Sequence, residues 1–206
     1  MYLYTRNARV LSGGGEVMAD LIAITDFVNR NTELDTSLYS MAIGPEPGTI
    51  SWSGIVQRRS ELVDATDKLL PRDEYWAIVD RIRPHVTPVI DSLLTPIHAT
   101  GQLGVKPDFV SGVWGQSVGA LPEVVGWAIE MTELVTTITG APVVLSANSI
   151  GPIGQLGFMS AGESVDELED RTQAIWADER YMAKLAEAKD MFQPGVGGAA
   201  VWRKVH

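Results

Sequence analysis

The sequence predicts an α+β protein in which one β-α-β-β-α-β unit occurs twice along a single chain. Three observations lead to this prediction. An Ile-Gly-Pro triplet at 43–45 returns at 150–152, an offset of 107 residues. The same offset aligns further residues of mixed chemistry, for example Glu16 with Glu123, which indicates an internal duplication. Each copy also carries an apolar stripe at helical spacing after its first extended run.

The elements follow the same order in both copies. The predicted strands are 2–9, 37–43, 49–56 and 92–98 in the first copy, and 109–117, 143–150, 155–159 and 199–205 in the second. The helical stripes are Val17-Leu21-Ile24-Val28 and Val124-Ala128-Met131-Val135. A second helix follows the third strand of each copy. Ser60 and Ser164 are its N-cap candidates, and Ser164 with Glu167 has the spacing of a capping box.

Two ferredoxin-like repeats result from this order, with boundaries at 1–99 and 109–206 and an exposed linker at 100–108. A four-stranded sheet with its helices on one face leaves the other face bare. We expect that face to be apolar and to need a partner. The second repeat in the same chain supplies the partner, so the two repeats are predicted to form an intrachain barrel, a pseudo-dimer within one chain.

Composition limits the possible functions. The chain has 206 residues, is 45% apolar and carries a formal charge of −10. Because phosphate binding requires a basic stripe, nucleic acid and anionic membranes are not expected as partners. The absence of cysteine excludes disulfides and thiolate metal sites. The first residues lack the layout of a secretory signal, so a cytoplasmic location is expected. Residues 141–159 are apolar, but a central Gly-Pro break favours two strands over a membrane span.

Several segments carry a resemblance to a known group of proteins. In the first copy they are AIGPEPGTISWSGIVQRRSEL, LPRDEYWAIVDRI and DSLLTPIHAT, and in the second copy SIGP and ADERY. Together they cover nearly the whole chain, which resembles the dimeric α+β barrel superfamily and, within it, the NIPSNAP-like proteins. The resemblance implies the barrel fold. It does not imply one activity, because this fold hosts monooxygenases, isomerases, haem enzymes and members of no known activity.

The resemblance also suggests site residues. Monooxygenases of this fold use an Asn on the first strand, a Trp before the second helix and a His on that helix. Asn7 matches the first and His85 could match the third, whereas Arg58 occupies the Trp position, which argues against haem degradation. We expect any ligand pocket in the first copy, bounded by Asn7, Arg58 and His85. An equally open alternative is that Asn7 ends strand pairing at a bulge.

Asn148 in the second copy is a further candidate, because its counterpart Met41 is apolar. A buried amide must find hydrogen-bond partners. Trp52, Trp114 and Trp127 are interpreted as core aromatics rather than ligand stackers.

Other motifs are given structural interpretations. Gly13-Gly14-Gly15 fits a tight strand-to-helix turn better than a phosphate site. His85, His98 and His206 lack metal-ligand spacing, so neither a metal nor a cofactor is expected, and His206 is expected to be frayed. The acidic pairs Asp73-Glu74 and Asp178-Glu179 are expected on solvated helix faces.

Two classes of function remain. The first is a small-molecule-binding or structural barrel protein without identifiable catalytic machinery, which the scarcity of acid–base groups favours. The alternative is a cofactor-independent monooxygenase-type enzyme that acts on a small apolar substrate. A small apolar ligand and a homodimer are both possible partners under either hypothesis.

Overall fold

A computed structural model describes residues 1–102 and 106–206 of the chain, so residues 103–105 of the expected linker lie outside the described residues. The elements of the first half are β1 (Tyr2–Arg9), α1 (Gly14–Asn31), β2 (Ser37–Ile43), β3 (Thr49–Val56), α2 (Ser60–Leu69), α3 (Asp73–Ile82), the 3₁₀ turn η1 (Arg83–His85) and β4 (Ile90–Ala99). Those of the second half are β5 (Phe109–Ser117), α4 (Leu121–Thr139), β6 (Val143–Ile150), β7 (Gln155–Gly162), α5 (Val165–Ala177), α6 (Glu179–Glu187), η2 (Ala188–Asp190) and β8 (Phe192–Lys204).

The eight strands follow the hydrogen-bonded order β1-β3-β2-β8-β5-β7-β6-β4, which closes into a barrel. This confirms the predicted α+β barrel of β-α-β-β-α-β halves. The contacts divide the chain into two units. The first unit comprises Met1–Met41, Glu46–Leu94 and Lys204–His206, and the second comprises Ala42–Pro45 and Thr95–Arg203. In the described part of the chain, none of the helices has the length and apolar character needed to cross a membrane.

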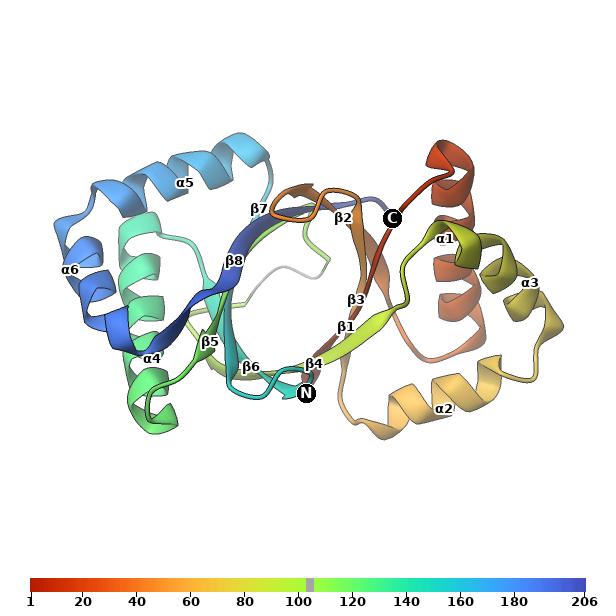
Figure 1. Ribbon diagram of the computed structural model, residues 1–206, viewed down its shortest axis with the longest axis horizontal. Coiled ribbons are helices and arrows are strands. Elements are labelled where there is room, and N and C mark those ends of the chain that lie inside the picture. Colours follow the sequence, from red (N-terminus) through yellow and green to blue (C-terminus); the bar gives the residue numbers. More distant parts are fainter. Residues whose placement is uncertain (103–105) are drawn as a thin grey trace. The chain divides into compact units, whose positions relative to one another are not determined.

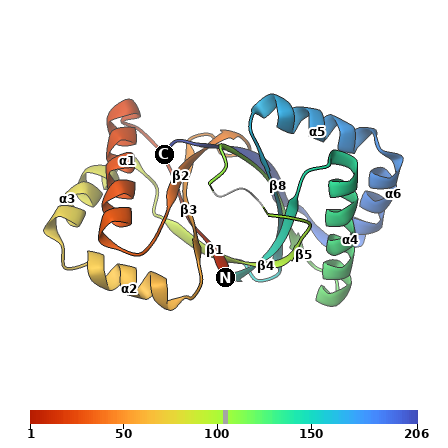
Figure 2. The same cartoon turned by 180° about the vertical axis from the view of Figure 1, so that it is seen from behind.

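The first unit packs α1, α2 and α3 on one face of its strands (Figures 1 and 2). Strand residues alternate between two faces. Those facing the helices are apolar: Ala8, Leu38 and Ile50 form one core with Val17 and Leu21 of the predicted α1 stripe. Trp52 packs against this core, and its Nε1 donates a hydrogen bond to Thr25 Oγ1 at 2.9 Å, so its interpretation as a core aromatic is confirmed.

The opposite face of the first sheet was predicted to be apolar, and it is mixed: Leu3 pairs there with Ile55 and Leu94, beside a row of hydroxyl groups. The register places Ser37 opposite Ser53, Ser53 opposite Thr5, and Thr5 opposite Ser92, a row of hydroxyl groups across four strands. Ser37 is buried. The alternation of small polar residues with apolar ones in SLYSMAI and TISWSGIV already contains this row.

The second unit builds its core in the same way, with α4, α5 and α6 on one face of its strands (Figure 1). The predicted α4 residues Val124, Ala128 and Met131 are buried against Leu145 and Leu156. Trp127 joins this core, and its Nε1 donates to the Lys184 carbonyl at 2.9 Å. Trp114 is half-buried and lies on the strand face away from this core.

The predicted second helix is in fact two helices in each half. Pro71 follows α2 and has no N–H group with which to continue it. In the second half Asp178 adopts an extended backbone after α5, and its carboxylate accepts a hydrogen bond from the Arg180 N–H at 2.8 Å. Asp178 is therefore an N-cap and not only part of a solvated face.

The two predicted N-caps behave differently. Ser164 accepts from the Glu167 N–H at 3.1 Å, and Glu167 accepts from the Glu163 N–H at 2.7 Å, which confirms Ser164 as the cap. Ser60 makes no cap, because α2 begins at Ser60 itself. There the Glu61 carboxylate accepts from the Gln57 and Arg58 N–H groups, both at 3.1 Å, and takes over the capping.

The chain's last residues are also ordered, contrary to the expected fraying of His206. The Leu38 N–H donates to the His206 carbonyl at 2.9 Å, and the Val205 N–H donates to the Leu38 carbonyl at 2.8 Å. His206 Nε2 lies 2.8 Å from Asp26 Oδ1 on α1. Backbone pairing with β2 holds His206 within the first unit.

Candidate functional site

Asn7 lies in the middle of β1, opposite Ser51 of β3 and Ile90 of β4. Pairing with β3 is continuous from Tyr2 to Arg9, so no bulge occurs at Asn7 on that side, whereas the register with β4 ends at the Asn7–Ile90 pair. Because Ala8 belongs to the helix-facing core, Asn7 lies on the hydroxyl face of the sheet. It therefore does not point into the layer between the sheet and its helices.

Arg58 and His85 lie at opposite ends of β1. Arg58 is exposed and follows Val56, which pairs with Tyr2. His85 is half-buried, and its carbonyl accepts a hydrogen bond from Leu11 at 2.7 Å. From Tyr2 to Leu11 an extended chain covers about 30 Å. The register does not bring Asn7, Arg58 and His85 together, and a ligand role for each of them stays a prediction.

Asn148 lies on β6 in the second unit. Its Nδ2 donates to Gln155 Oε1 at 2.7 Å, while its Oδ1 is buried and has no hydrogen-bond partner among the described residues. Gln155 pairs with Gln116, whose Nε2 donates to the Ile153 carbonyl at 2.7 Å. These amides brace the β6–β7 hairpin, and any ligand role for Asn148 remains a prediction.

Each histidine contacts a different residue rather than another histidine. His98 Nε2 lies 3.4 Å from Glu133 Oε1 without hydrogen-bond geometry, His206 contacts Asp26, and His85 contacts Ser12. Among the described residues, no group of three or more acidic or histidine side chains is arranged to hold a metal ion.

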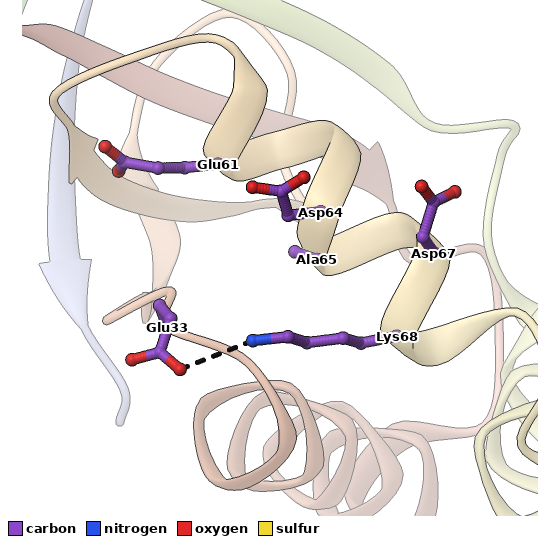
Figure 3. Close-up of a pocket in the computed structure, with 6 residues that line it drawn as sticks. All are labelled: Glu33, Glu61, Asp64, Ala65, Asp67 and Lys68. Carbon is purple, nitrogen blue, oxygen red and sulfur yellow. Dashed lines mark hydrogen bonds and ion pairs between the residues drawn. The ribbon is translucent and has the colours of Figure 1, made fainter.

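An open depression of about 300 Å³ lies beside α2 (Figure 3). It is lined by Glu33, Glu61, Asp64, Ala65, Asp67 and Lys68. Lys68 Nζ lies 3.3 Å from Glu33 Oε1, and the carboxylates of Asp64 and Asp67 point away from this ion pair. Because these acids do not converge on one point, the depression is a charged surface rather than a site.

A polar cluster that the sequence analysis missed lies on the helix-facing side of the first sheet. We call Tyr4, Arg6 and Asp91 the Arg6 cluster. Arg6 Nε and Nη2 donate to the two oxygens of Asp91 at 2.7 and 2.8 Å, and the Tyr4 hydroxyl donates to Asp91 Oδ1 at 3.1 Å. Tyr4 packs in the core with Leu93. Arg6 lies two residues after Tyr4 on the same strand, so both side chains point to the same face of the sheet.

Burial and pairing set the ionisation of the cluster. Burial raises the pKa of Tyr4, so its phenol stays neutral. The hydrogen bonds with Asp91 raise the pKa of Arg6. At Asp91 burial acts to raise the pKa, but the bonds from Arg6 and Tyr4 outweigh it and the pKa is lowered. The Arg6 and Asp91 side chains remain 37% and 42% exposed, so a solute can reach them.

One signal could have revealed the cluster from the sequence. At the 107-residue offset Tyr4 aligns with Ser111 and Arg6 with Val113. The charged residues therefore stand where the other repeat is small or apolar. The partner Asp91 is 85 residues from Arg6, and only the β1–β4 register identifies it.

Comparisons with known proteins support the fold. No family model matches the sequence, and no curated protein matches it. A solved structure described as an anthrone oxidase-like protein aligns with a TM-score of 0.72 at 12% identity, covering 100% of this chain and 92% of that one. The chain has the dimeric α+β barrel fold. A candidate monooxygenase from Fusobacterium nucleatum aligns with a TM-score of 0.68 at 11% identity, covering 100% of this chain and 93% of that one.

A NIPSNAP family protein of unknown function from Agrobacterium tumefaciens also matches. It is 20% identical and covers 47% of this chain and 86% of its own, with a TM-score of 0.40. At their identities the two full-length alignments describe architecture and transfer no activity.

Proposed function

We propose that this protein binds a small, mostly apolar molecule on the helix-facing side of its first sheet, with the rest of the barrel serving as scaffold. The observation that carries the proposal is the Arg6 cluster, a charged group within an otherwise apolar layer. The bonds to Asp91 use Arg6 Nε and Nη2, and we propose that Nη1 donates to an oxygen atom of the ligand.

The Arg6 cluster is expected to contribute little to the stability of the fold. Half-exposed ion pairs contribute on the order of 0–1 kcal/mol. The aligned residues Ser111 and Val113 show that the strand does not need charge at these positions. Asp91 holds the guanidinium in one orientation through two hydrogen bonds, which is what a binding group requires.

A titration with benzoate, benzyl alcohol and benzylamine, followed by protein NMR, tests the proposal. Benzoate or benzyl alcohol is expected to shift signals of residues around Arg6. Arg6→Gln should weaken binding by about tenfold or more, because a hydrogen bond to a charged group is lost. The matched control is Arg180→Gln, which removes the exposed Arg180–Asp178 pair of the second unit. Absence of binding by all three probes, or equal weakening by both variants, contradicts the proposal.

We also propose that the chain arose by tandem duplication, with repeats at 1–99 and 109–206 and a linker at 100–108. Glu61 and Glu167 support this, since each accepts from the backbone N–H four residues earlier. The backbone bond from Leu11 to His85 in the first half also corresponds to the bond from Val118 to Met191 in the second half.

We propose in addition that the protein is located in the cytoplasm. Fractionation of the source cells would test this location.

A cofactor-independent monooxygenase-type activity on a small apolar substrate is the second candidate. The full-length similarity to the structure described as anthrone oxidase-like favours it. Oxygen uptake with anthrone as the probe substrate decides between the candidates. Uptake that Arg6→Gln lowers and Arg180→Gln leaves unchanged would establish this activity in place of binding alone.

A further inference from the structure

Ser12 and His85 form a second polar pair in the first unit, beyond the end of β1. Ser12 Oγ lies 2.9 Å from His85 Nδ1, although the residues are 73 positions apart. Ser12 is exposed and stands just before α1, whereas His85 is half-buried at the end of η1.

The backbone holds this pair in place. Leu11 donates to the His85 carbonyl at 2.7 Å, and Thr87 donates to the Arg9 carbonyl at 2.9 Å. A Cβ on Gly13 would lie 2.2 Å from Val17 Cγ2 and 3.1 Å from His85 Nδ1, so both side chains pack against this glycine. Gly13 also has a φ of 91°, a conformation that favours glycine. The glycine turn thus fits the imidazole against the start of α1.

The second unit has the same backbone arrangement with different side chains. The Val118 N–H donates to the Met191 carbonyl at 2.9 Å, as Leu11 does to His85. Met191 thus corresponds to His85, Val118 corresponds to Leu11, and Gly119 corresponds to Ser12. Since the second unit keeps this backbone arrangement with glycine and methionine, the hydroxyl and imidazole of the first unit are not required for packing.

The surroundings suit a nucleophile. A serine hydroxyl within hydrogen-bond reach of an imidazole can pass its proton to that base as it attacks. The first N–H groups of a helix have no acceptor within the helix and form its positive end, and those of α1 follow Ser12 directly.

We propose that Ser12 and His85 act as a nucleophile and general base toward activated carboxylic esters. Ser12 Oγ bonds to the ester carbonyl carbon while His85 takes the hydroxyl proton. The ester C–O bond then breaks, and His85 returns the proton to the departing oxygen. Water attacks the acyl-serine, His85 takes a proton from that water and delivers it to Ser12 Oγ, and a carboxylic acid leaves. This activity goes beyond ligand binding at the Arg6 cluster and does not depend on it.

A fluorophosphonate probe tests the proposal on the full-length protein, with intact-mass measurement and peptide mapping. We expect one adduct, on Ser12, together with turnover of p-nitrophenyl acetate. Ser12→Ala should abolish the adduct, and His85→Gln should slow its formation about 100-fold or more, the usual contribution of a general base. Ser60→Ala removes an exposed serine that caps nothing, and it should leave labelling unchanged.

The double variant Ser12→Gly with His85→Met copies the Gly119–Met191 pair of the second unit, so its fold should persist. Circular dichroism checks the fold, and labelling should be absent. The proposal is overturned if Ser12 of the native protein stays unlabelled, if His85→Gln reacts at the native rate, or if the label spreads evenly over exposed serines.

Discussion

Arg6 and Asp91 are both partly exposed, and this decides how much their ion pair contributes to folding. The pKa of Asp91 lies below its ordinary value because the bonds from Arg6 and Tyr4 outweigh burial. A carboxyl group with a lowered folded-state pKa adds stability above its unfolded pKa, near 4, and loses it as the pH falls through the folded value. Solvent screening limits this contribution to below about 1 kcal/mol.

We therefore predict that Asp91→Asn reduces the acid sensitivity of the protein. Urea unfolding between pH 6 and pH 3 should show a smaller loss of stability in the variant than in the native protein, with the difference confined to pH values below about 4. Native and variant proteins with superimposable pH profiles would show that Asp91 contributes nothing to this loss.

At the scale of elements, the helix that follows the third strand is capped differently in the two halves. Ser164 accepts a backbone hydrogen bond at the start of α5, whereas Ser60 accepts none at the start of α2. We predict that Ser164→Ala lowers the free energy of unfolding by about 1 kcal/mol. Ser60→Ala should change it by less than about 0.5 kcal/mol. Urea denaturation of both variants measures the difference, and equal losses would contradict the assignment of the caps.

At the scale of the whole molecule, the first unit draws on both ends of the chain. Lys204–His206 cluster with residues near the N-terminus, and Leu38 of β2 exchanges backbone hydrogen bonds with Val205 and His206. We predict that deleting residues 205–206 raises hydrogen exchange at Leu38 roughly tenfold or more, because its N–H loses its acceptor. Exchange in β6, within the second unit, is the internal control. Unchanged protection at Leu38 would mean that these bonds do not hold β2.

The sequence by itself predicted the order of the strands and the helix that follows the first strand of each half. The 107-residue offset, the apolar stripe of α1 and α4, and the Gly-Pro turns after Ile43 and Ile150 are local or periodic signals, and they placed β2, β3, β5 and β6 at the observed bounds. The alternation of side chains along the strands also places Thr5, Ser37, Ser53 and Ser92 on one face, although the polar character of that face was not predicted.

Only the tertiary structure decided which polar residues meet. Strand register joined Arg6 to Asp91 and separated Asn7 from Arg58 and His85, while the turn at Gly13 set Ser12 against His85. Ser60 is not a cap because α2 begins at Ser60 itself, and the Glu61 carboxylate accepts from the Gln57 and Arg58 N–H groups before the helix. The physical reason is range: periodicity records which face a residue occupies within its own element, whereas contacts 73 or 85 positions apart depend on strand pairing and turn geometry that no local pattern encodes.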